Sequence, residues 1–152
     1  MPRAISNKNV ADAKFNPAPF DGPFKASLGC PELKGSWLIF GKSGSGKTTF
    51  ALQLAKYLTR FVDKVAFDSL EQGLSLSMQK AWKRVDMEEA GSKVIFLDKE
   101  PLPELRDRLS KRKSPNVVVI DSVICLVGMR LADYQKLMND YPDKLFIFLA
   151  HE

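Results

Sequence analysis

Short apolar runs alternate along the chain with stretches in which apolar residues recur every three or four positions. The runs, which predict β-strands, cover residues 36–40, 64–68, 94–97, 116–121 and 145–150. Helical spacing predicts helices near residues 50–58, 74–85, 102–109 and 134–138. Strands that are continuously apolar are expected to be buried on both faces. The pattern therefore predicts an α/β fold, with a parallel sheet of about five strands sandwiched by helices.

The first 34 residues follow a different pattern. They contain five of the nine prolines and show no helical periodicity. Because proline fixes φ and removes a backbone donor, residues 1–34 are expected to form an extended arm. A partly disordered leader is the alternative. The regular pattern begins at Gly35, so residues 35–152 are expected to form the core.

Composition narrows the class of protein. Of the 152 residues, 45% are hydrophobic and 27% are charged, so one globular domain is expected and disorder over the whole length is excluded. No apolar run is long enough to cross a membrane, and the N-terminus lacks the apolar segment of a secretory signal. Cys30 and Cys125 have no CxxC partner, which favours two buried thiols in a reducing, cytoplasmic setting, with a single disulfide as the alternative. The net charge of +5 favours phosphate-bearing partners only slightly.

A glycine-rich stretch follows the first strand and matches the pattern G-x-x-x-x-G-K-[ST] without a mismatch. It consists of Gly41, Lys42, Ser43, Gly44, Ser45, Gly46, Lys47 and Thr48, and Thr49 comes next. Glycines let such a loop fold into a nest of inward-pointing N–H groups, and the following helix turns its positive end to the same anion. Lys47 is expected to reach the β and γ phosphates of a nucleotide. Lys42 and Ser43 fill variable positions, so only backbone contacts are expected from them.

A carboxylate for a metal ion is expected at the end of the fourth strand, where four apolar residues lead to Asp121. In open α/β sheets ligands bind at the carboxyl ends of the strands, so Asp121 is expected to face the nucleotide. There it would hold Mg²⁺ together with the Thr48 hydroxyl, directly or through water.

Hydrolysis also needs a group that activates water. Many phosphate-loop ATPases place a glutamate directly after the metal aspartate, but Ser122 stands there in this chain. Glu71 follows the end of the second strand and would face the γ phosphate if that strand neighbours the strand of Asp121. Asp68 is the competing candidate. Otherwise Glu71 caps a helix that begins near Gly73.

These elements together resemble the RecA-like ATPases, and most closely the KaiC, RadA and replicative helicase branches. The resemblance spans about residues 28–152 and rests on the stretch 35–53 with its phosphate loop, on F-D-S-L-E at 67–71 and on V-V-V-I-D-S at 117–122. It implies a P-loop NTPase core that binds ATP and Mg²⁺, in which Glu71 activates water. It also implies a sensor strand, here residues 145–150, that lies between the phosphate-loop strand and the strand of Asp121. The tip of this strand, His151, is implied to contact the γ phosphate.

The same resemblance carries expectations about the rest of the protein. RecA-like cores continue beyond the sensor strand, so residues 35–152 are expected to be either a fragment that lacks the C-terminal part of the core or a minimal core. The arginine finger and the second DNA loop of such cores cannot be located in these residues. Relatives form rings or filaments, so a homo-oligomer is expected. DNA is a possible partner by resemblance, but the residues themselves do not support it. Relatives place a DNA loop after the strand of the metal aspartate, and the corresponding segment 123–133 carries one cation, Arg130. The cations that cluster before the fourth strand favour a solvated helix face over a nucleic-acid patch: Arg106, Arg108, Lys111, Arg112 and Lys113.

The leading hypothesis is Mg²⁺-dependent binding and hydrolysis of ATP. A non-hydrolysing nucleotide switch or assembly protein is the first alternative. A nucleotide kinase is the less favoured one, because only Arg130 stands where such enzymes carry an arginine-rich lid.

Overall fold

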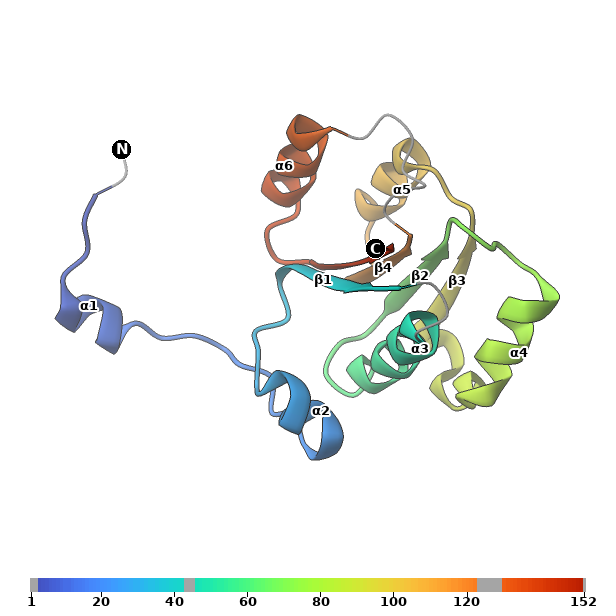
Figure 1. Ribbon diagram of the computed structural model, residues 1–152. Coiled ribbons are helices and arrows are strands. Elements are labelled where there is room, and N and C mark those ends of the chain that lie inside the picture. Colours follow the sequence, from blue (N-terminus) through green and yellow to red (C-terminus); the bar gives the residue numbers. More distant parts are fainter. Residues whose placement is uncertain (1–2, 43–45, 123–129, 152) are drawn as a thin grey trace. The chain divides into compact units, whose positions relative to one another are not determined.

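The computed structural model describes residues 3–42, 46–122 and 130–151 (Figure 1). The chain divides into two units, Met1–Glu32 and Leu33–Glu152. The β-sheet and the helices packed on it belong to the second unit. Within the described ranges, no helix combines the length and the apolar character that crossing a bilayer requires.

Two short helices lie in the first unit, α1 (Asn7–Asp12) and α2 (Gly22–Leu28). The Ser6 hydroxyl begins α1 by accepting a hydrogen bond from the Asn9 amide at 3.1 Å. A proline stands in the first turn of α2, where its missing N–H costs nothing. These local signals place two short helices in a segment that its prolines predict to be extended.

Cys30 is exposed, so the expectation of two buried thiols is wrong for this residue. The reason lies just before it, because α2 ends at Gly29, whose φ of 70° turns the chain out of the helix. The thiol therefore lies on the surface of the turn, with Sγ 3.9 Å from the Phe20 carbonyl oxygen. Cys125 lies outside the described residues.

The second unit alternates strands and helices along the chain. Its elements are β1 (Gly35–Gly41), α3 (Lys47–Leu58), β2 (Val65–Ser69), α4 (Leu76–Arg84), the 3₁₀ helix η1 (Met87–Lys93), β3 (Val94–Asp98), α5 (Leu102–Leu109), β4 (Val117–Asp121), α6 (Leu131–Asp140) and β5 (Leu145–His151). The five strands form one parallel sheet in the order β1-β5-β4-β2-β3. The predicted α/β fold with a five-stranded parallel sheet is confirmed, and each strand begins and ends within about one residue of its predicted bounds.

Helices cover both faces of this sheet, α3 and α4 on one and α5 and α6 on the other (Figure 1). Side chains of one strand alternate between the two faces. Phe67 of β2 meets Trp82 of α4 edge-on, with 6.3 Å between the ring centroids. The preceding residue, Ala66, packs instead in a cluster with Leu105 of α5. Every residue of β2 and β4 is buried, which confirms two-sided burial for the central strands.

Strand β1 departs from that expectation. Leu38 is 64% exposed and Phe40 is 60% exposed. Leu38 is the register partner of Phe148 on β5, so both lie on the α5/α6 face, but only Phe148 belongs to the buried cluster. Because β1 is an edge strand of the described sheet, one of its faces extends beyond the covering helices. An apolar run thus predicts a strand without fixing its place in the sheet.

The start of α4 also differs from the prediction. Leu74 was expected on the helix, but it lies before it and is 73% exposed. The helix begins after Ser75, whose hydroxyl accepts a hydrogen bond from the Met78 amide at 3.1 Å. A capping side chain therefore decided the boundary, which apolar spacing alone placed too early.

Candidate functional site

Four strand ends bring the predicted site residues to one edge of the sheet. The phosphate loop follows β1, Asp121 ends β4, His151 ends β5, and Glu71 follows β2. β5 lies between β1 and β4, and β2 lies on the far side of β4. Both conditions stated from the sequence are thereby met: the strand of Glu71 neighbours the strand of Asp121, and the expected sensor strand lies between the phosphate-loop strand and the Asp121 strand.

The phosphate loop leads into α3 as its spacing predicts. Gly46 has φ of 89°, a conformation that strains any residue with a side chain, and α3 begins at the next residue. The Lys47 ammonium donates hydrogen bonds to the carbonyl oxygens of Gly41 at 2.8 Å and of Lys42 at 2.6 Å. Lys47 is 8% exposed, so its charge lies inside the loop rather than in solvent. Ser43, Gly44 and Ser45 lie outside the described residues.

Thr48 and Asp121 are brought into direct contact. The Thr48 hydroxyl donates a hydrogen bond to Asp121 Oδ2 at 3.0 Å, across 73 residues of sequence. Asp121 is 2% exposed. Burial raises the pKa of Asp121, and the nearby Glu71 carboxylate raises it further, while Thr48, His151 and Lys47 act in the opposite direction. A buried carboxylate beside a hydroxyl is an oxygen pair that a small divalent cation would stabilise.

Glu71 and His151 form a pair at the same edge of the sheet. His151 Nε2 lies 2.7 Å from Glu71 Oε2. The backbone N–H of Glu71 donates to the carbonyl oxygen of Asp121 at 3.0 Å, which fixes the turn after β2 against the end of β4. Ligand atoms of Glu71, Asp121 and His151 all lie within 4.8 Å of one another. Three potential cation ligands therefore converge at the point where the sequence predicts the γ phosphate.

A cavity of about 390 Å³ joins these groups. It is lined by Gly46, Lys47, Thr48, Thr49, Glu71, Gln72 and His151. Sequence reasoning missed Gln72, although its place directly after Glu71, in the turn that follows β2, was a usable signal. The cavity opens at the first turn of α3, where free backbone N–H groups and the helix dipole favour an anion.

Asp68, the competing candidate for activating water, lies elsewhere. It sits on β2 next to Phe67 and so points to the opposite face of the sheet. Its Oδ1 accepts a hydrogen bond from the Glu100 amide at 3.0 Å, and its Oδ2 is buried without a hydrogen-bond partner among the described residues. Burial raises the pKa of Asp68 to about 7. The hydrogen bond from the Glu100 amide opposes this shift, the Glu100 carboxylate adds to it, and Arg108 opposes it least. Asp68 does not line the cavity of the phosphate loop.

The basic residues around α5 are largely paired within the chain. Arg106 bonds to Asp140 of α6. Arg108 binds the Glu100 carboxylate through two nitrogens, at 2.9 and 2.8 Å. Lys111 and Asp107 pair at 3.2 Å on the surface. These contacts support the interpretation of a solvated, ion-paired helix face.

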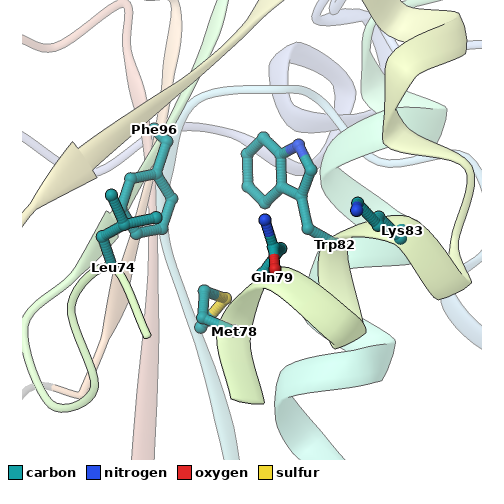
Figure 2. A pocket seen from close by; sticks show the side chains of 6 residues that line it. All are labelled: Leu74, Met78, Gln79, Trp82, Lys83 and Phe96. Atoms are coloured by element: carbon teal, nitrogen blue, oxygen red, sulfur yellow. The ribbon is translucent and has the colours of Figure 1, made fainter. Parts of the chain in front are cut away.

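A second cavity, of about 270 Å³, lies between α4 and β3 (Figure 2). It is lined by Leu74, Met78, Gln79, Trp82, Lys83 and Phe96. The Trp82 ring meets Phe96 edge-on with 5.5 Å between centroids. The walls are mainly apolar, so this cavity carries no phosphate chemistry.

Comparison with known proteins gives one sequence relative and several structural ones. The chain is 29% identical over 102 residues to the DNA repair and recombination protein RadB of Methanosphaera stadtmanae, a match that covers 62% of this chain and 44% of RadB. The chain thus spans less than half the length of this curated relative. No protein-family profile matches it.

Three solved structures share its architecture. The flagellar accessory protein FlaH from Methanocaldococcus jannaschii aligns with a TM-score of 0.64 at 14% identity, over 86% of this chain and 67% of FlaH. A solved ATPase domain aligns with a TM-score of 0.56 at 23% identity, over 78% of this chain and 57% of that domain. A DnaB-like replicative helicase aligns with a TM-score of 0.55 at 22% identity, over 78% of this chain and 38% of the helicase.

Proposed function

From the RecA-like P-loop ATPase fold that this chain has, we propose that it binds ATP together with Mg²⁺ and hydrolyses the terminal phosphate bond. One observation carries the proposal. Lys47, Thr48, Glu71 and His151 come from three separate parts of the sequence and line one cavity, and Asp121 is hydrogen-bonded to its wall. Packing alone gives no reason to collect a cation, a hydroxyl, two carboxylates and an imidazole at a single sheet edge.

The phosphates would lie at the first turn of α3. The N-terminal N–H groups of a helix have no intrahelical partner and attract anions. Lys47 adds a positive charge that is already directed into the loop by its bonds to the Gly41 and Lys42 carbonyl oxygens. A bound phosphate would take over part of this hydrogen bonding, with an ammonium–phosphate ion pair in place of an ammonium–carbonyl bond.

Thr48 and Asp121 are the residues that fit Mg²⁺. Their oxygens are of the kind this cation prefers, they lie 3.0 Å apart, and the buried Asp121 carboxylate has a raised pKa that a neighbouring cation would offset. When bound, Mg²⁺ would supply positive charge against the negative charge that develops on the phosphate oxygens. The protein's part is to hold the hydroxyl and the carboxylate on one side of the cavity.

Glu71 is proposed to activate the attacking water. Its carboxylate would accept the water proton as the water oxygen bonds to the terminal phosphorus. The bond from that phosphorus to the bridging oxygen breaks, and ADP leaves with the bonding electron pair. The hydrogen bond from the Glu71 backbone N–H to the Asp121 carbonyl oxygen holds the backbone of Glu71 at the end of β4, so the residue stays beside the cavity before substrate arrives.

DNA is the first client to test, because the sequence relative is a DNA repair and recombination protein. The paired cations of α5 give no support for a DNA-binding surface there. Addition of single-stranded DNA to the ATPase assay would test DNA as a partner, and sedimentation would test for a homo-oligomer.

The proposed function is tested by calorimetric titration with ATP, with and without Mg²⁺, and by release of inorganic phosphate. Lys47→Ala is expected to weaken ATP binding by about a hundredfold, because it removes a charged hydrogen-bond donor from the phosphates. Lys80→Ala removes an exposed lysine of α4 and should change the affinity by less than about threefold. Tight binding of ATP without phosphate release would favour the non-hydrolysing switch instead. Equal binding by wild type and Lys47→Ala would remove the phosphate loop from the proposal.

A further inference from the structure

His151 has two ring nitrogens in unlike surroundings. Nε2 lies 2.7 Å from Glu71 Oε2, on the side of the cavity that both residues line. Nδ1 is buried and has no hydrogen-bond partner among the described residues. An imidazole N–H serves one strong acceptor at a time. Only Nε2 is therefore available to a group inside the cavity, and that nitrogen is already engaged with Glu71.

The position of His151 places this nitrogen close to the phosphate loop. His151 pairs in register with Gly41, the first residue of the loop, because β5 runs beside β1. On its other side β5 pairs with β4, which ends at Asp121. A terminal phosphate held by the loop would thus lie within reach of the same N–H that Glu71 occupies.

We infer that Glu71 and the terminal phosphate compete for the single N–H of His151. The inference rests on the proposed function and adds a coupling to it. A nucleoside diphosphate leaves the Glu71–His151 pair intact, so the carboxylate stays restrained. A triphosphate draws the N–H to itself, and the released carboxylate becomes free to accept a proton from water. His151 is then a positioning residue that admits Glu71 to catalysis only when a terminal phosphate is present.

The histidine can be observed directly, because the chain contains a single one. Long-range ¹H–¹⁵N NMR spectra of ¹⁵N-labelled protein report which ring nitrogen carries the proton and what it is bonded to. We expect the Nε2 resonance to move with Mg²⁺ and the β,γ-imido analogue of ATP and to stay in place with ADP, while Nδ1 moves little. Equal shifts with both nucleotides, or no shift although calorimetry shows that both bind, would overturn the inference.

A double-mutant cycle measures the competition as a free-energy coupling. The quantity is the ratio of affinities for the imido triphosphate and for ADP. Glu71→Ala frees the N–H, so this ratio should rise about tenfold, the size expected for one charge-assisted hydrogen bond. In a His151→Phe background only the effect of the lost carboxylate charge remains, so the same substitution should raise the ratio several-fold less. That effect is common to both backgrounds and cancels in the coupling free energy.

Two controls separate the possible failures. Glu71→Gln removes the charge but keeps an acceptor for Nε2, so its ratio should stay below that of Glu71→Ala. His151→Gln restores a side-chain N–H donor and should recover part of the coupling that His151→Phe loses. Additive single effects, with nucleotide bound by every variant, would sink the competition and leave the proposed ATPase intact. A wild-type chain that binds neither nucleotide would sink both.

Discussion

Two cavities of the second unit, one at the phosphate loop and one between α4 and β3, differ in what builds them. The cavity at the phosphate loop collects polar and charged groups from loops and strand ends that are far apart in the sequence. The cavity between α4 and β3 is made mainly by apolar side chains around Trp82 and Phe96, with Lys83 at its wall (Figure 2). The first cavity gathers the groups that the proposed hydrolysis of ATP needs, and the second is a consequence of packing at an edge strand.

This difference explains why the first cavity could be predicted and the second could not. A phosphate site needs particular residue types at fixed spacing, so a matching stretch of sequence predicts such a site directly. An apolar hollow depends on which side chains happen to meet, and Leu74, Trp82 and Phe96 carry no such signature. We therefore expect substitutions in the first cavity to change ATP binding or hydrolysis at nearly constant stability. Substitutions in the second cavity should lower stability and leave ATP binding nearly unchanged.

Glu71→Gln should give the largest effect. Removal of the base should lower the rate of phosphate release about a thousandfold, within the range known for general bases, while ATP affinity changes little. Single-turnover phosphate release and calorimetry on the same sample measure the two quantities. Glu104→Gln, which alters an exposed glutamate of α5, should leave both within about twofold. Wild-type turnover in Glu71→Gln would assign the base to another group and weaken the contrast between the cavities.

The sheet shows how far the sequence could lead. All five strands were found, because runs such as Val117–Asp121 are buried on both faces and their apolar character is continuous. The place of β5 between β1 and β4 came from the resemblance, and the pairing of β2 with β4 was only a condition, since no local pattern tells which strands are neighbours. Burial of β1 was overestimated, because the exposure of Leu38 depends on its edge position.

The site could be predicted in part for the same reason. The loop, Asp121 and Glu71 are proposed as site residues from spacing and from strand ends, and Glu71 lies beside Asp121 because β2 pairs with β4. The Glu71–His151 contact could not be derived, since it joins residues 80 positions apart through side-chain geometry. Asp68 was the competing candidate for activating water. Side chains alternate along β2, so Asp68 lies on the face of the sheet opposite to Phe67 and away from the cavity.

Trp82→Ala tests the second cavity. Trp82 packs edge-on against Phe67 and Phe96, so its loss should lower the free energy of unfolding by about 3 kcal/mol. Denaturant unfolding measures this change. Leu74→Ala lies at the same cavity but removes a side chain that is 73% exposed, so it should cost less than about 0.5 kcal/mol. Well below the unfolding transition, the ATP affinity of Trp82→Ala should stay within about threefold of wild type. A large loss of affinity would mean that the two cavities are coupled.

Asp68→Asn is expected to have the smallest effect, which is a change in how stability depends on pH. It tests whether a buried titratable group outside the phosphate-loop cavity affects stability alone. Burial raises its pKa from 3.8 to about 7, so between these values the folded chain keeps a proton that the unfolded chain has lost. The folded state then binds more protons than the unfolded one, and its stability falls as the pH rises from about 4 to about 7. Local entry of water on ionisation offsets part of the cost, so we expect a loss of about 2 kcal/mol over this window.

Asn carries no charge and keeps an oxygen for the Glu100 amide, so this part of the pH dependence should disappear in Asp68→Asn. Chemical unfolding at a series of pH values from about 4 to about 8 measures it, and Asp63→Asn, at an exposed position, is the matched control. If both variants follow the wild-type profile, Asp68 is ionised in the folded chain over the whole pH range, and burial does not raise its pKa. If the pH dependence of stability flattens only in Asp68→Asn while ATP binding is unchanged, Asp68 contributes to packing on the α5 face of the sheet and not to nucleotide chemistry.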